Sequence, residues 1–297
     1  MHDDEVPADE GTVRTLLEEQ FPQWSALPLR PVPSDGTVNR LLRLGDDLVV
    51  RLPLQAGDPA AKRAWLEAEA QAARWLVGRL PVDTPEPVAL GEPSTAYPLP
   101  WAVYRWLPGT VATAVDVGGS VELARDLAAV VAVLWATDTD GRVFTGSGRG
   151  GALSDHDAYV ARSLEHSRGL VDTEALRRLW SDLRSTPRSD ADAWTHGDLM
   201  PGNLLVRDGR LGALIDVGGV GPADPALDLQ PAWNLLTGEA RRAFREALAV
   251  GDERWRRGMG WALAQAVGCL WYYRETNPPM SRLAHHTLTE LLADGAS

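Results

Sequence analysis

Hydrophobic and polar positions are spaced differently in the two parts of the chain. In the first part, short apolar runs predict strands at 41–43, 48–51, 88–90 and 101–107. One long pattern with helical spacing covers 60–80, and Asp58-Pro59 before it predicts a capped helix start. A shorter pattern predicts a helix at 12–20. This part is therefore expected to be strand-rich with one main helix.

Helical spacing dominates from Ser120 onward. Ser120 is predicted to cap a helix at 121–136, and Thr173 one at 174–183. Ser154 with Asp157 resembles a capping box for a helix that ends near residue 168. Further helices are expected at 239–250, 253–273 and 281–292. The glycine-rich stretch 141–151 predicts a flexible loop. A domain boundary is expected near Pro108-Gly109.

One hairpin interrupts the helical part. Asp208-Gly209 separates the apolar runs Leu204–Arg207 and 211–215, and this dipeptide favours a type I′ turn with positive φ at both residues. Pairing about the turn places Asn203 opposite Leu214, and Asp216 lies two residues further on the same face. Such diagonal neighbours lie roughly 7–8 Å apart. Their oxygen-bearing side chains could then converge on one cation.

The loop before this hairpin carries the candidate chemistry. Residues 195–203 read Thr-His-Gly-Asp-Leu-Met-Pro-Gly-Asn, which places Asn203 five residues after Asp198 and Asp216 thirteen after Asn203. Kinase-type phosphoryl-transfer enzymes use one Asp to orient the attacking hydroxyl, and an Asn with a later Asp to hold Mg²⁺. The competing interpretation is a surface hairpin with ordinary polar ends. The motif, the predicted turn and the placement of Asn203 and Asp216 on the same face of the hairpin agree, which favours a phosphoryl-transfer site.

Composition narrows the class of protein further. With 297 residues, 44% of them hydrophobic and 24% charged, the chain is expected to be globular. A net charge of −12 argues against nucleic acid as a partner and slightly favours a cationic one. The single cysteine, Cys269, excludes a disulfide within the chain. No membrane span or signal peptide is predicted, so a cytoplasmic protein is expected, whereas the oligomeric state is left open.

Several segments, in this order, resemble the aminoglycoside phosphotransferase family of protein-kinase-like enzymes that phosphorylate small molecules. They are residues 35–40, 48–53, the helix with Glu69, 103–109, 196–203, 215–216 and 224–229. The resemblance implies an α+β, bilobal, protein-kinase-like fold. Its small β-rich N-terminal lobe, residues 1–107, has one main helix and would bind nucleotide, with a hinge at about 103–109. The large helical lobe, residues 108–297, would hold the catalytic loop and the acceptor.

The resemblance also implies roles for individual residues. Asp198 is the catalytic carboxylate, Asn203 and Asp216 are the Mg²⁺ ligands, and His196 and Asp228 support the loop. The residues implied for binding ATP or GTP are Gly36, Arg51, Glu69, Tyr104, Trp106, Leu205 and Ile215. In that set, Glu69 would orient the phosphate-binding cation Arg51 through an ion pair.

Some positions depart from the family pattern or leave alternatives open. The phosphate-binding cation is commonly lysine, but Lys62 is the only lysine and begins a helix, so Arg51 would serve. Arg51 could instead be a surface strand end, and Glu67 competes with Glu69 as its partner. Met200 replaces a polar residue of the loop, and Gly219 stands where many relatives carry an acid.

The expected function is Mg²⁺-dependent transfer of a nucleotide γ-phosphate to a hydroxyl of a small, cationic molecule, such as an aminoglycoside or macrolide antibiotic. This would make the protein a candidate antibiotic-resistance enzyme. One alternative is a small-metabolite kinase for a choline- or homoserine-like substrate. Others are a non-catalytic, kinase-like nucleotide-binding protein and a Mg²⁺-dependent phosphohydrolase. Asp155, Asp157, Glu165 and Glu275 are the acids considered for attracting a cationic acceptor.

Overall fold

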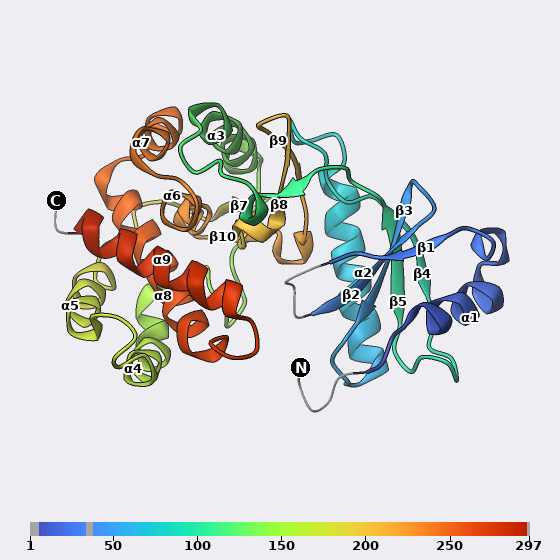
Figure 1. Cartoon of the computed structure of the whole chain (residues 1–297). Coiled ribbons are helices and arrows are strands. Elements are labelled where there is room, and N and C mark those ends of the chain that lie inside the picture. The colour runs from blue at the N-terminus through green and yellow to red at the C-terminus, as the bar shows by residue number, and fades with distance from the viewer. Residues whose placement is uncertain (1–5, 34–37, 296–297) are drawn as a thin grey trace. The chain divides into compact units, whose positions relative to one another are not determined.

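The computed structural model describes residues 6–33 and 38–295. Two compact units share the chain: Met1–Pro108 with Ala213–Gly218, and Gly109–Gly212 with Gly219–Ser297. The first unit is built on a β-sheet and the second is mainly helical (Figure 1). The mixed architecture expected from the sequence, with a sheet in the N-terminal region and helices in the C-terminal region, is confirmed. The segment 213–218 is sequentially remote from the rest of the first unit.

The first unit is an antiparallel sheet with one helix against each face. Its strands follow the spatial order β1-β2-β3-β5-β4. The elements are α1 (Glu10–Gln20), β1 (Leu29–Pro31), β2 (Asn39–Leu44), β3 (Leu48–Pro53), α2 (Pro59–Leu76), β4 (Pro87–Gly91) and β5 (Trp101–Arg105). A turn at 45–47 joins β2 and β3, as the sequence predicts.

Alternation along β3 explains how this sheet separates its two faces. Leu48, Val50 and Leu52 belong to the hydrophobic cluster that includes Leu16 and Leu17 of α1. Because successive strand side chains point to opposite faces, Arg51 points away from α1. Arg51 therefore faces the side of the sheet on which α2 carries Glu69, its ion-pair partner.

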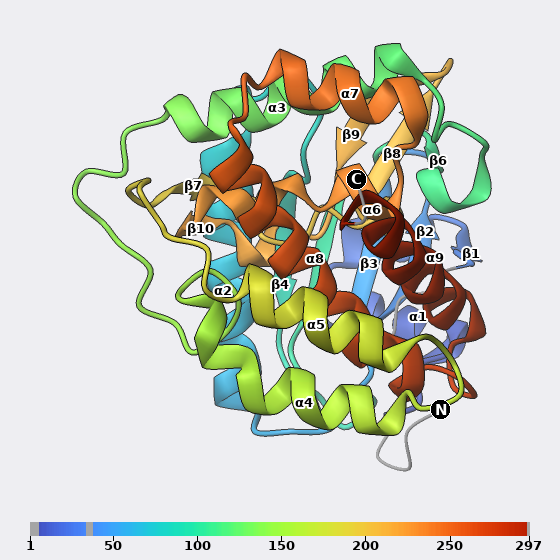
Figure 2. The ribbon, with the colours of Figure 1, turned by 90° about the vertical axis from the view of Figure 1, so that its left-hand side faces the viewer.

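The second unit contains the remaining elements. They are β6 (Thr110–Val111), α3 (Val121–Ala136), α4 (Asp157–His166), α5 (Thr173–Leu183), β7 (Ala193–Thr195), β8 (Leu204–Arg207), β9 (Arg210–Leu214, whose last two residues group with the first unit), β10 (Gly221–Ala223), α6 (Pro231–Asn234), α7 (Gly238–Ala247), α8 (Asp252–Tyr272) and α9 (Pro278–Gly295). Figure 2 shows α3 packed along α7, and α4 beside α5. Helix α8 is central, since it packs against α4, α5 and α9. None of the helices among the described residues is both long and apolar enough to cross a membrane.

The structure confirms one predicted helix cap and the predicted hairpin turn, and it contradicts two other predicted caps. Ser120 caps α3 as expected, accepting a hydrogen bond from the Leu123 backbone. Asp208 and Gly209 have φ values of 50° and 76°, so the left-handed turn between β8 and β9 is confirmed. The cap of α5 is Asp172, because its carboxylate bonds the Ala175 backbone, and the prediction of Thr173 is wrong. The capping box at Ser154 is also wrong, since no side-chain cap precedes α4.

The main helix ends earlier than its pattern predicts. Helix α2 stops at Leu76, and Gly78 follows with φ of 72°. This left-handed conformation favours glycine and terminates the helix before Leu80. The hydrophobic spacing continues past the true end because Leu80 is buried outside the helix.

A buried carboxylate fixes the start of the loop that carries Asp198. Strand β7 pairs with β10, and the chain then leaves β7 through His196 and Gly197. The two carboxylate oxygens of Asp228 each accept one backbone hydrogen bond, from the N–H groups of His196 and Gly197, at 2.9 Å. Asp228 is completely buried. The turn therefore depends on a side chain that lies thirty-two residues further along the chain.

A second buried carboxylate, Asp224, ties α8 to the same region. Its side chain caps the 3₁₀ turn Pro225–Leu229 through the Ala226 N–H. It also accepts hydrogen bonds from Arg257 Nε at 2.9 Å and from Trp261 Nε1 at 2.8 Å. Asp224 and Arg257 are both almost fully buried, with 1% and 4% of their surfaces exposed. Removing one partner would leave the other as an uncompensated buried charge.

We therefore predict that Arg257→Met lowers the free energy of unfolding by about 3–5 kcal/mol, the usual cost of breaking a buried ion pair by removing one partner. Urea unfolding followed by circular dichroism measures this change. The matched control is Arg256→Met, because Arg256 is the exposed neighbour on the same helix. Equal effects of the two substitutions would contradict the structural role of the buried pair.

Asp228 also predicts a pH dependence of stability. Burial raises the pKa of Asp228 from 3.8 to about 7, although the N–H groups of Gly197 and His196 oppose the shift. The folded state therefore holds this proton more tightly than the unfolded chain does. Its contribution is complete below about pH 4 and is lost as the pH rises to about 7, with a slope of at most about 1.4 kcal/mol per pH unit.

The measurement is the difference in unfolding free energy between wild type and Asp228→Asn, from pH 4.5 to 8. We expect wild type to lose stability relative to the variant up to about pH 7 and to run parallel to it above. The difference isolates this group from other carboxylates whose pKa values are lowered, such as Asp126 and Asp190. A difference that does not change with pH would contradict the account.

Candidate active site

The candidate catalytic loop is held in one conformation from both sides. Gly197 has φ of 79°, and a Cβ at this position would approach the Gly219 carbonyl oxygen to 3.3 Å. A side chain would be strained there on both counts. The His196 side chain is buried, and the loop ends in the 3₁₀ turn Pro201–Asn203. The loop therefore presents Asp198 from a backbone that is fixed before and after it.

Asp198 is surrounded by three hydrogen-bond donors from different parts of the helical unit. Its Oδ1 accepts from Arg149 Nη2 at 3.0 Å and from Gln265 Nε2 at 2.7 Å. Its Oδ2 accepts from Asn203 Nδ2 at 3.1 Å, and the same amide nitrogen bonds the Asp198 carbonyl at 2.9 Å. The Asp198 side chain is 34% exposed. It is therefore oriented by several groups and still reachable from solvent.

Arg149 was not predicted as a site residue. It lies in the glycine-rich stretch, whose backbone is tied to the rest of the unit: the Gly150 carbonyl accepts from the Asp224 N–H at 2.9 Å. Gly150 has φ of 126°, and a Cβ there would come within 2.8 Å of Ala223. The Phe144 ring also approaches this glycine, and the Phe144 N–H donates to Asp192 at 2.7 Å. These contacts place the guanidinium against the candidate catalytic carboxylate.

Gln265 was missed as well, although the sequence carried a usable signal. It is the polar residue between the apolar positions Ala262 and Cys269 on one face of α8. A polar group on a core-facing helix stripe needs a partner, and here the partner is Asp198. For Arg149 the only signal was an arginine between glycines, which does not indicate a partner in another loop.

A second cluster lies in the sheet-rich unit, around the ion pair of Arg51 and Glu69. Arg51 Nη1 lies 2.6 Å from Glu69 Oε1, and the two side chains are 12% and 0% exposed. Burial disfavours the charged guanidinium, but the Glu69 carboxylate outweighs it and raises the pKa of Arg51. Glu67 is exposed on α2, so the alternative that it pairs with Arg51 is wrong. Arg51 is not a surface strand end either.

Asp216 belongs to the same unit and adds a negative charge near this pair. Its carboxylate contributes to raising the pKa of Arg51. Asp216 itself is exposed and has φ of 60°, a strained conformation for a residue other than glycine. Strand β9 ends at Leu214, so strand alternation does not extend to Asp216. The sequence analysis placed Asn203 and Asp216 on the same face of a strand pair. Because Asp216 lies outside the strand, strand alternation does not determine where its side chain points.

The other described residues expected at a nucleotide site lie in β5 and β8 or directly after β5 and β9. Tyr104 lies within β5 and is buried, with the Arg51 guanidinium 5.1 Å from its ring centre. Trp106 follows β5, and its N–H donates to the Asp47 carbonyl at 2.8 Å. Leu205 is buried in β8, while Ile215 is partly exposed after β9. Gly36 lies outside the described residues. Their assignment to nucleotide binding stays a prediction.

The chemistry of the donor groups fits a hard cation better than a transition metal. No group of three or more His, Cys, Asp or Glu side chains within 6–33 and 38–295 is placed to hold a metal ion. Asn203 offers an amide and Asp216 an exposed carboxylate. Mg²⁺ is typically bound through one or two protein oxygens, with water and substrate phosphates completing the shell. An amide oxygen and a carboxylate are each the kind of group that binds Mg²⁺.

Solved structures share this fold. APH(2")-IIia, described in a complex with GDP and kanamycin, is 22% identical with a TM-score of 0.71, and the match covers 95% of this chain and 98% of that one. The macrolide 2'-phosphotransferase MphH from Brachybacterium faecium is 22% identical with a TM-score of 0.63, covering 92% and 97%. A macrolide 2'-phosphotransferase type I is 19% identical with a TM-score of 0.64, covering 95% and 98%. At these identities the likeness establishes a kinase-like fold.

No curated protein matches the sequence. A family model does match, and its description is "Phosphotransferase enzyme family"; it covers residues 29–264. The matched region includes Arg51 of β3 and Glu69 of α2, the loop with Asp198 and Asn203, and the segment with Asp216. The chain therefore belongs to the phosphotransferase enzyme family.

Proposed function

We propose that this protein transfers the γ-phosphate of ATP or GTP to a hydroxyl group of a small molecule, with Mg²⁺ as cofactor. The observation that carries the proposal is the arrangement around Asp198. A partly exposed carboxylate stands on a fixed backbone, with Asn203 bonded to it five residues later. Phosphoryl transfer needs positioning and charge stabilisation more than covalent catalysis by the protein. Membership of the phosphotransferase family supports this reading.

Asp198 has two tasks in the proposed reaction. Its carboxylate accepts a hydrogen bond from the acceptor hydroxyl and orients the oxygen lone pair toward the γ-phosphorus. As the new oxygen–phosphorus bond forms, the bond from phosphorus to the β,γ-bridging oxygen breaks, and the hydroxyl proton passes to Asp198. The donors Gln265 and Asn203 keep the carboxylate in a single orientation during this step. Such positioning is a large part of catalysis in this class.

The sheet-rich unit supplies the proposed nucleotide-binding groups. Arg51 is assigned to the phosphates, because its guanidinium is permanently charged and can form two hydrogen bonds. Glu69 holds that guanidinium through one oxygen, and its Oε2 has no hydrogen-bond partner among the described residues. Asn203 and Asp216 are proposed as oxygen ligands of Mg²⁺, which would neutralise phosphate charge when bound. Tyr104, Trp106, Leu205 and Ile215 are assigned to the nucleotide base and sugar.

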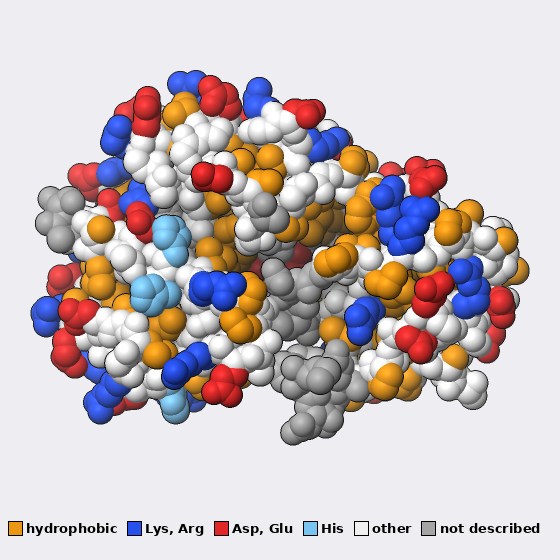
Figure 3. All heavy atoms as spheres, in the orientation of Figure 1, with side chains coloured by type: hydrophobic (Ala, Val, Ile, Leu, Met, Phe, Trp, Pro, Cys, Tyr) orange, Lys and Arg blue, Asp and Glu red, His pale blue; other side chains and the backbone are white. Residues whose placement is uncertain are grey.

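An antibiotic acceptor, and with it a resistance role, is the first candidate. Support comes from structures of similar fold, described with kanamycin, with gentamicin, and with streptomycin and ATP. Of the acids considered for a cationic acceptor, Asp157 bonds Arg184 and Trp180, and Glu165 bonds Arg177. Asp155 and Glu275 are exposed. In Figure 3, acidic and basic side chains are interspersed over the visible face of the helical unit, so a cationic acceptor would need a local acidic contact.

A small-metabolite kinase is the second candidate, and Arg149 is the observation that favours it. This guanidinium reaches Asp198, and its Nη1 is buried without a hydrogen-bond partner in the described part of the chain. A cation beside the reacting hydroxyl would attract an acceptor that carries a carboxylate, as homoserine does, and would repel choline. Comparing kcat/KM for homoserine, choline and kanamycin discriminates between these candidates.

We predict that Asp198→Asn lowers kcat by ~10²–10⁴, the usual contribution of a positioned general base. The substitution keeps the size and shape of the side chain but removes the negative charge. Nucleotide affinity should stay nearly unchanged, because Asp198 is not assigned to the metal. Asn203→Ala and Asp216→Ala are the matched comparison, and these should also weaken Mg²⁺-nucleotide binding. Single-turnover rates and nucleotide Kd values separate the three variants.

Full activity of Asp198→Asn would contradict the mechanism. A wild-type protein that binds Mg²⁺-nucleotide but phosphorylates no acceptor in a panel of aminoglycosides, macrolides and hydroxylated amines would instead indicate a non-catalytic binding protein. Nucleotide hydrolysis at the same rate with and without acceptor would indicate a phosphohydrolase.

A separate prediction concerns the buried pair. Arg51→Met should weaken nucleotide binding, and it should also lower stability by about 3–5 kcal/mol, because Glu69 stays buried without its cation. The double variant Arg51→Met/Glu69→Gln removes both charges and should recover most of the stability. It should not recover nucleotide binding. Thermal unfolding and equilibrium nucleotide titration measure the two effects.

The control is Arg30→Met, because Arg30 lies on the same sheet with a side chain that is 60% exposed. It should behave as wild type in both measurements. A double variant that binds nucleotide with the wild-type Kd would show that Arg51 has only a structural role.

A further inference from the structure

The ion pair between Arg149 and Asp198 uses only part of the guanidinium. Arg149 Nη2 donates to Asp198 Oδ1 at 3.0 Å, and Nη1 is buried without a hydrogen-bond partner among the described residues. Arg254 of the same unit shows the contrast, because its Nε and Nη2 bind the two oxygens of Asp190 at 2.7 and 2.6 Å. A guanidinium binds a carboxylate most firmly through two parallel bonds of this kind. Arg149 is therefore held less firmly than a structural arginine of the same chain.

The charged groups of this pair can separate without a large loss of stability. The side chains of Arg149 and Asp198 are 28% and 34% exposed, so water can solvate both charges when they part. Ion pairs in contact with solvent contribute little to stability for this reason. The pair of Asp224 and Arg257 is different, because both of its side chains are almost fully buried. Arg149 and Asp198 are thus suited to exchanging partners, whereas the buried pair is not.

The Arg149 side chain can leave Asp198 while the loop backbone stays in place. The following residue, Gly150, is held by the hydrogen bond from the Asp224 N–H to its carbonyl, and the Phe144 ring packs against it. On the other side of Arg149, a Cβ at Gly148 would meet no atom within 4 Å. Rotation about the bonds of the long arginine side chain is then sufficient to move the guanidinium.

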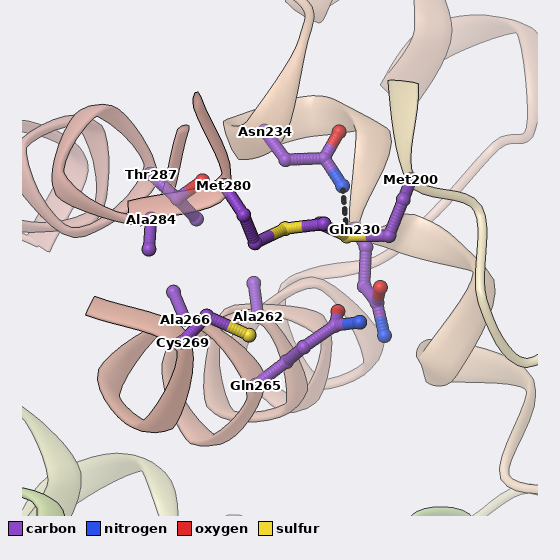
Figure 4. Close-up of a pocket in the computed structure, with 10 residues that line it drawn as sticks. All are labelled: Met200, Gln230, Asn234, Ala262, Gln265, Ala266, Cys269, Met280, Ala284 and Thr287. Carbon is purple, nitrogen blue, oxygen red and sulfur yellow. Dashed lines mark hydrogen bonds between the residues drawn. The ribbon is translucent and has the colours of Figure 1, made fainter. Parts of the chain in front are cut away.

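Asp198 keeps two other donors when Arg149 leaves. Figure 4 shows Gln265 extending from α8 beside a small pocket between α8 and α9, and its Nε2 donates to Asp198 Oδ1 at 2.7 Å. Asn203 Nδ2 donates to Oδ2 at 3.1 Å. A carboxylate oxygen has two lone pairs, and on Oδ1 both are used while Arg149 is bound. Departure of Arg149 frees one of them for a hydroxyl and leaves the carboxylate oriented.

A γ-phosphate is the group that would draw Arg149 away from Asp198. In the proposed reaction the γ-phosphorus bonds to the hydroxyl that Asp198 orients, so the γ-phosphate oxygens come close to the guanidinium. A phosphate group offers several negatively charged oxygens, and a guanidinium binds two of them in parallel. A nucleoside diphosphate lacks this terminal group. Only the triphosphate therefore offers Arg149 a stronger partner than its single bond to Asp198.

We propose that Arg149 is a latch on Asp198 that a γ-phosphate releases, and that it is a further catalytic residue of the reaction; this inference rests on the proposed function. The guanidinium pairs either with Asp198, as in the structure, or with the γ-phosphate of a bound nucleoside triphosphate. The second pairing leaves Asp198 free to accept the acceptor hydroxyl.

The transfer step then involves both residues. The hydroxyl oxygen bonds to the γ-phosphorus, and the bond from phosphorus to the β,γ-bridging oxygen breaks, its electron pair going to the diphosphate. The hydroxyl proton passes to Asp198. Arg149 keeps all of its protons and stabilises the negative charge of the transferring group through hydrogen bonds.

The first test measures nucleotide Kd values of the full chain with Mg²⁺ and without acceptor. The probes are ADP and its β,γ-imido triphosphate analogue, with the guanine pair in parallel. Arg149→Met should weaken binding of the analogue by about tenfold, as expected for losing hydrogen bonds to a charged group, and leave the diphosphate Kd unchanged. A merely structural role of Arg149 would change both Kd values together.

Two further variants complete the binding experiment. Arg142→Met makes the same chemical change in the same glycine-rich stretch, at a side chain that is 53% exposed, and should bind both probes as wild type does. Arg149→Lys keeps the charge but cannot form two parallel bonds, so it should weaken binding of the analogue by about threefold. It answers the same question if Arg149→Met does not fold.

The second test follows the latch by ¹⁵N NMR. The Nε–H signal of Arg149 is assigned by its absence from the spectrum of Arg149→Lys. This signal should shift when the triphosphate analogue is added and should not shift with the diphosphate. The Nε–H signal of Arg142, whose Nε donates to the Thr139 carbonyl, should stay unchanged with both. Equal shifts of the Arg149 signal with both nucleotides would overturn the inference.

The kinetic consequence is a loss of kcat. Arg149→Ala should lower kcat by about 10²–10³, the usual effect of removing one donor to developing charge, and added methylguanidinium should restore part of the rate. Arg149→Ala that raises only the acceptor KM and keeps the wild-type Kd of the triphosphate analogue would assign the guanidinium to an acceptor carboxylate. That result overturns the latch and leaves the proposed function intact. A wild-type protein that passes both binding tests but phosphorylates no acceptor would contradict the proposed function and not the exchange of Arg149.

Discussion

The hydrogen bonds from two consecutive backbone N–H groups to the carboxylate of Asp228 are the interaction on which the candidate site depends. They fix the chain where it leaves β7, and Gly197 accepts the left-handed conformation that results. Asp198 is the next residue, so its position follows from this turn. Asn203, Arg149 and Gln265 can bond one carboxylate only because that carboxylate stands in a defined place. A buried structural acid thus positions a partly exposed one.

The ion pairs of this arginine-rich chain differ in how completely their polar atoms are hydrogen-bonded. Asp224 and Arg257 form a buried pair with additional bonds from Trp261 and to the Thr186 carbonyl. That pair is structural. The pairs Arg51–Glu69 and Arg149–Asp198 each keep one group, Glu69 Oε2 and Arg149 Nη1, without a hydrogen-bond partner among the described residues. Incomplete pairing of buried charge is expected at binding sites rather than in a core.

Local chemistry was sufficient to predict much of the fold. The Asp208-Gly209 turn, the Ser120 cap and the order of strands and helices follow from backbone preferences that act over a few residues. The predicted cap of α5 was wrong because two capping residues, Asp172 and Thr173, are adjacent in the sequence. The predicted end of α2 was wrong because a buried leucine beyond Leu76 continues the hydrophobic spacing of the helix.

The candidate site was less predictable because its contacts join distant segments. The sequence motif indicated Asp198, Asn203 and Asp216, and their roles stay predictions. Nothing local to Arg149 or Gln265 shows that both reach Asp198, since they lie forty-nine and sixty-seven residues away in sequence.

The most direct test of the central claim is to identify the product of the reaction. Wild-type protein is incubated with Mg²⁺, ATP or GTP, and in turn kanamycin, a macrolide and homoserine, and the mixture is followed by ³¹P NMR. The account predicts a new phosphomonoester signal from one acceptor, formed in equal amount to the nucleoside diphosphate. Release of inorganic phosphate with no phosphomonoester from any acceptor would contradict it.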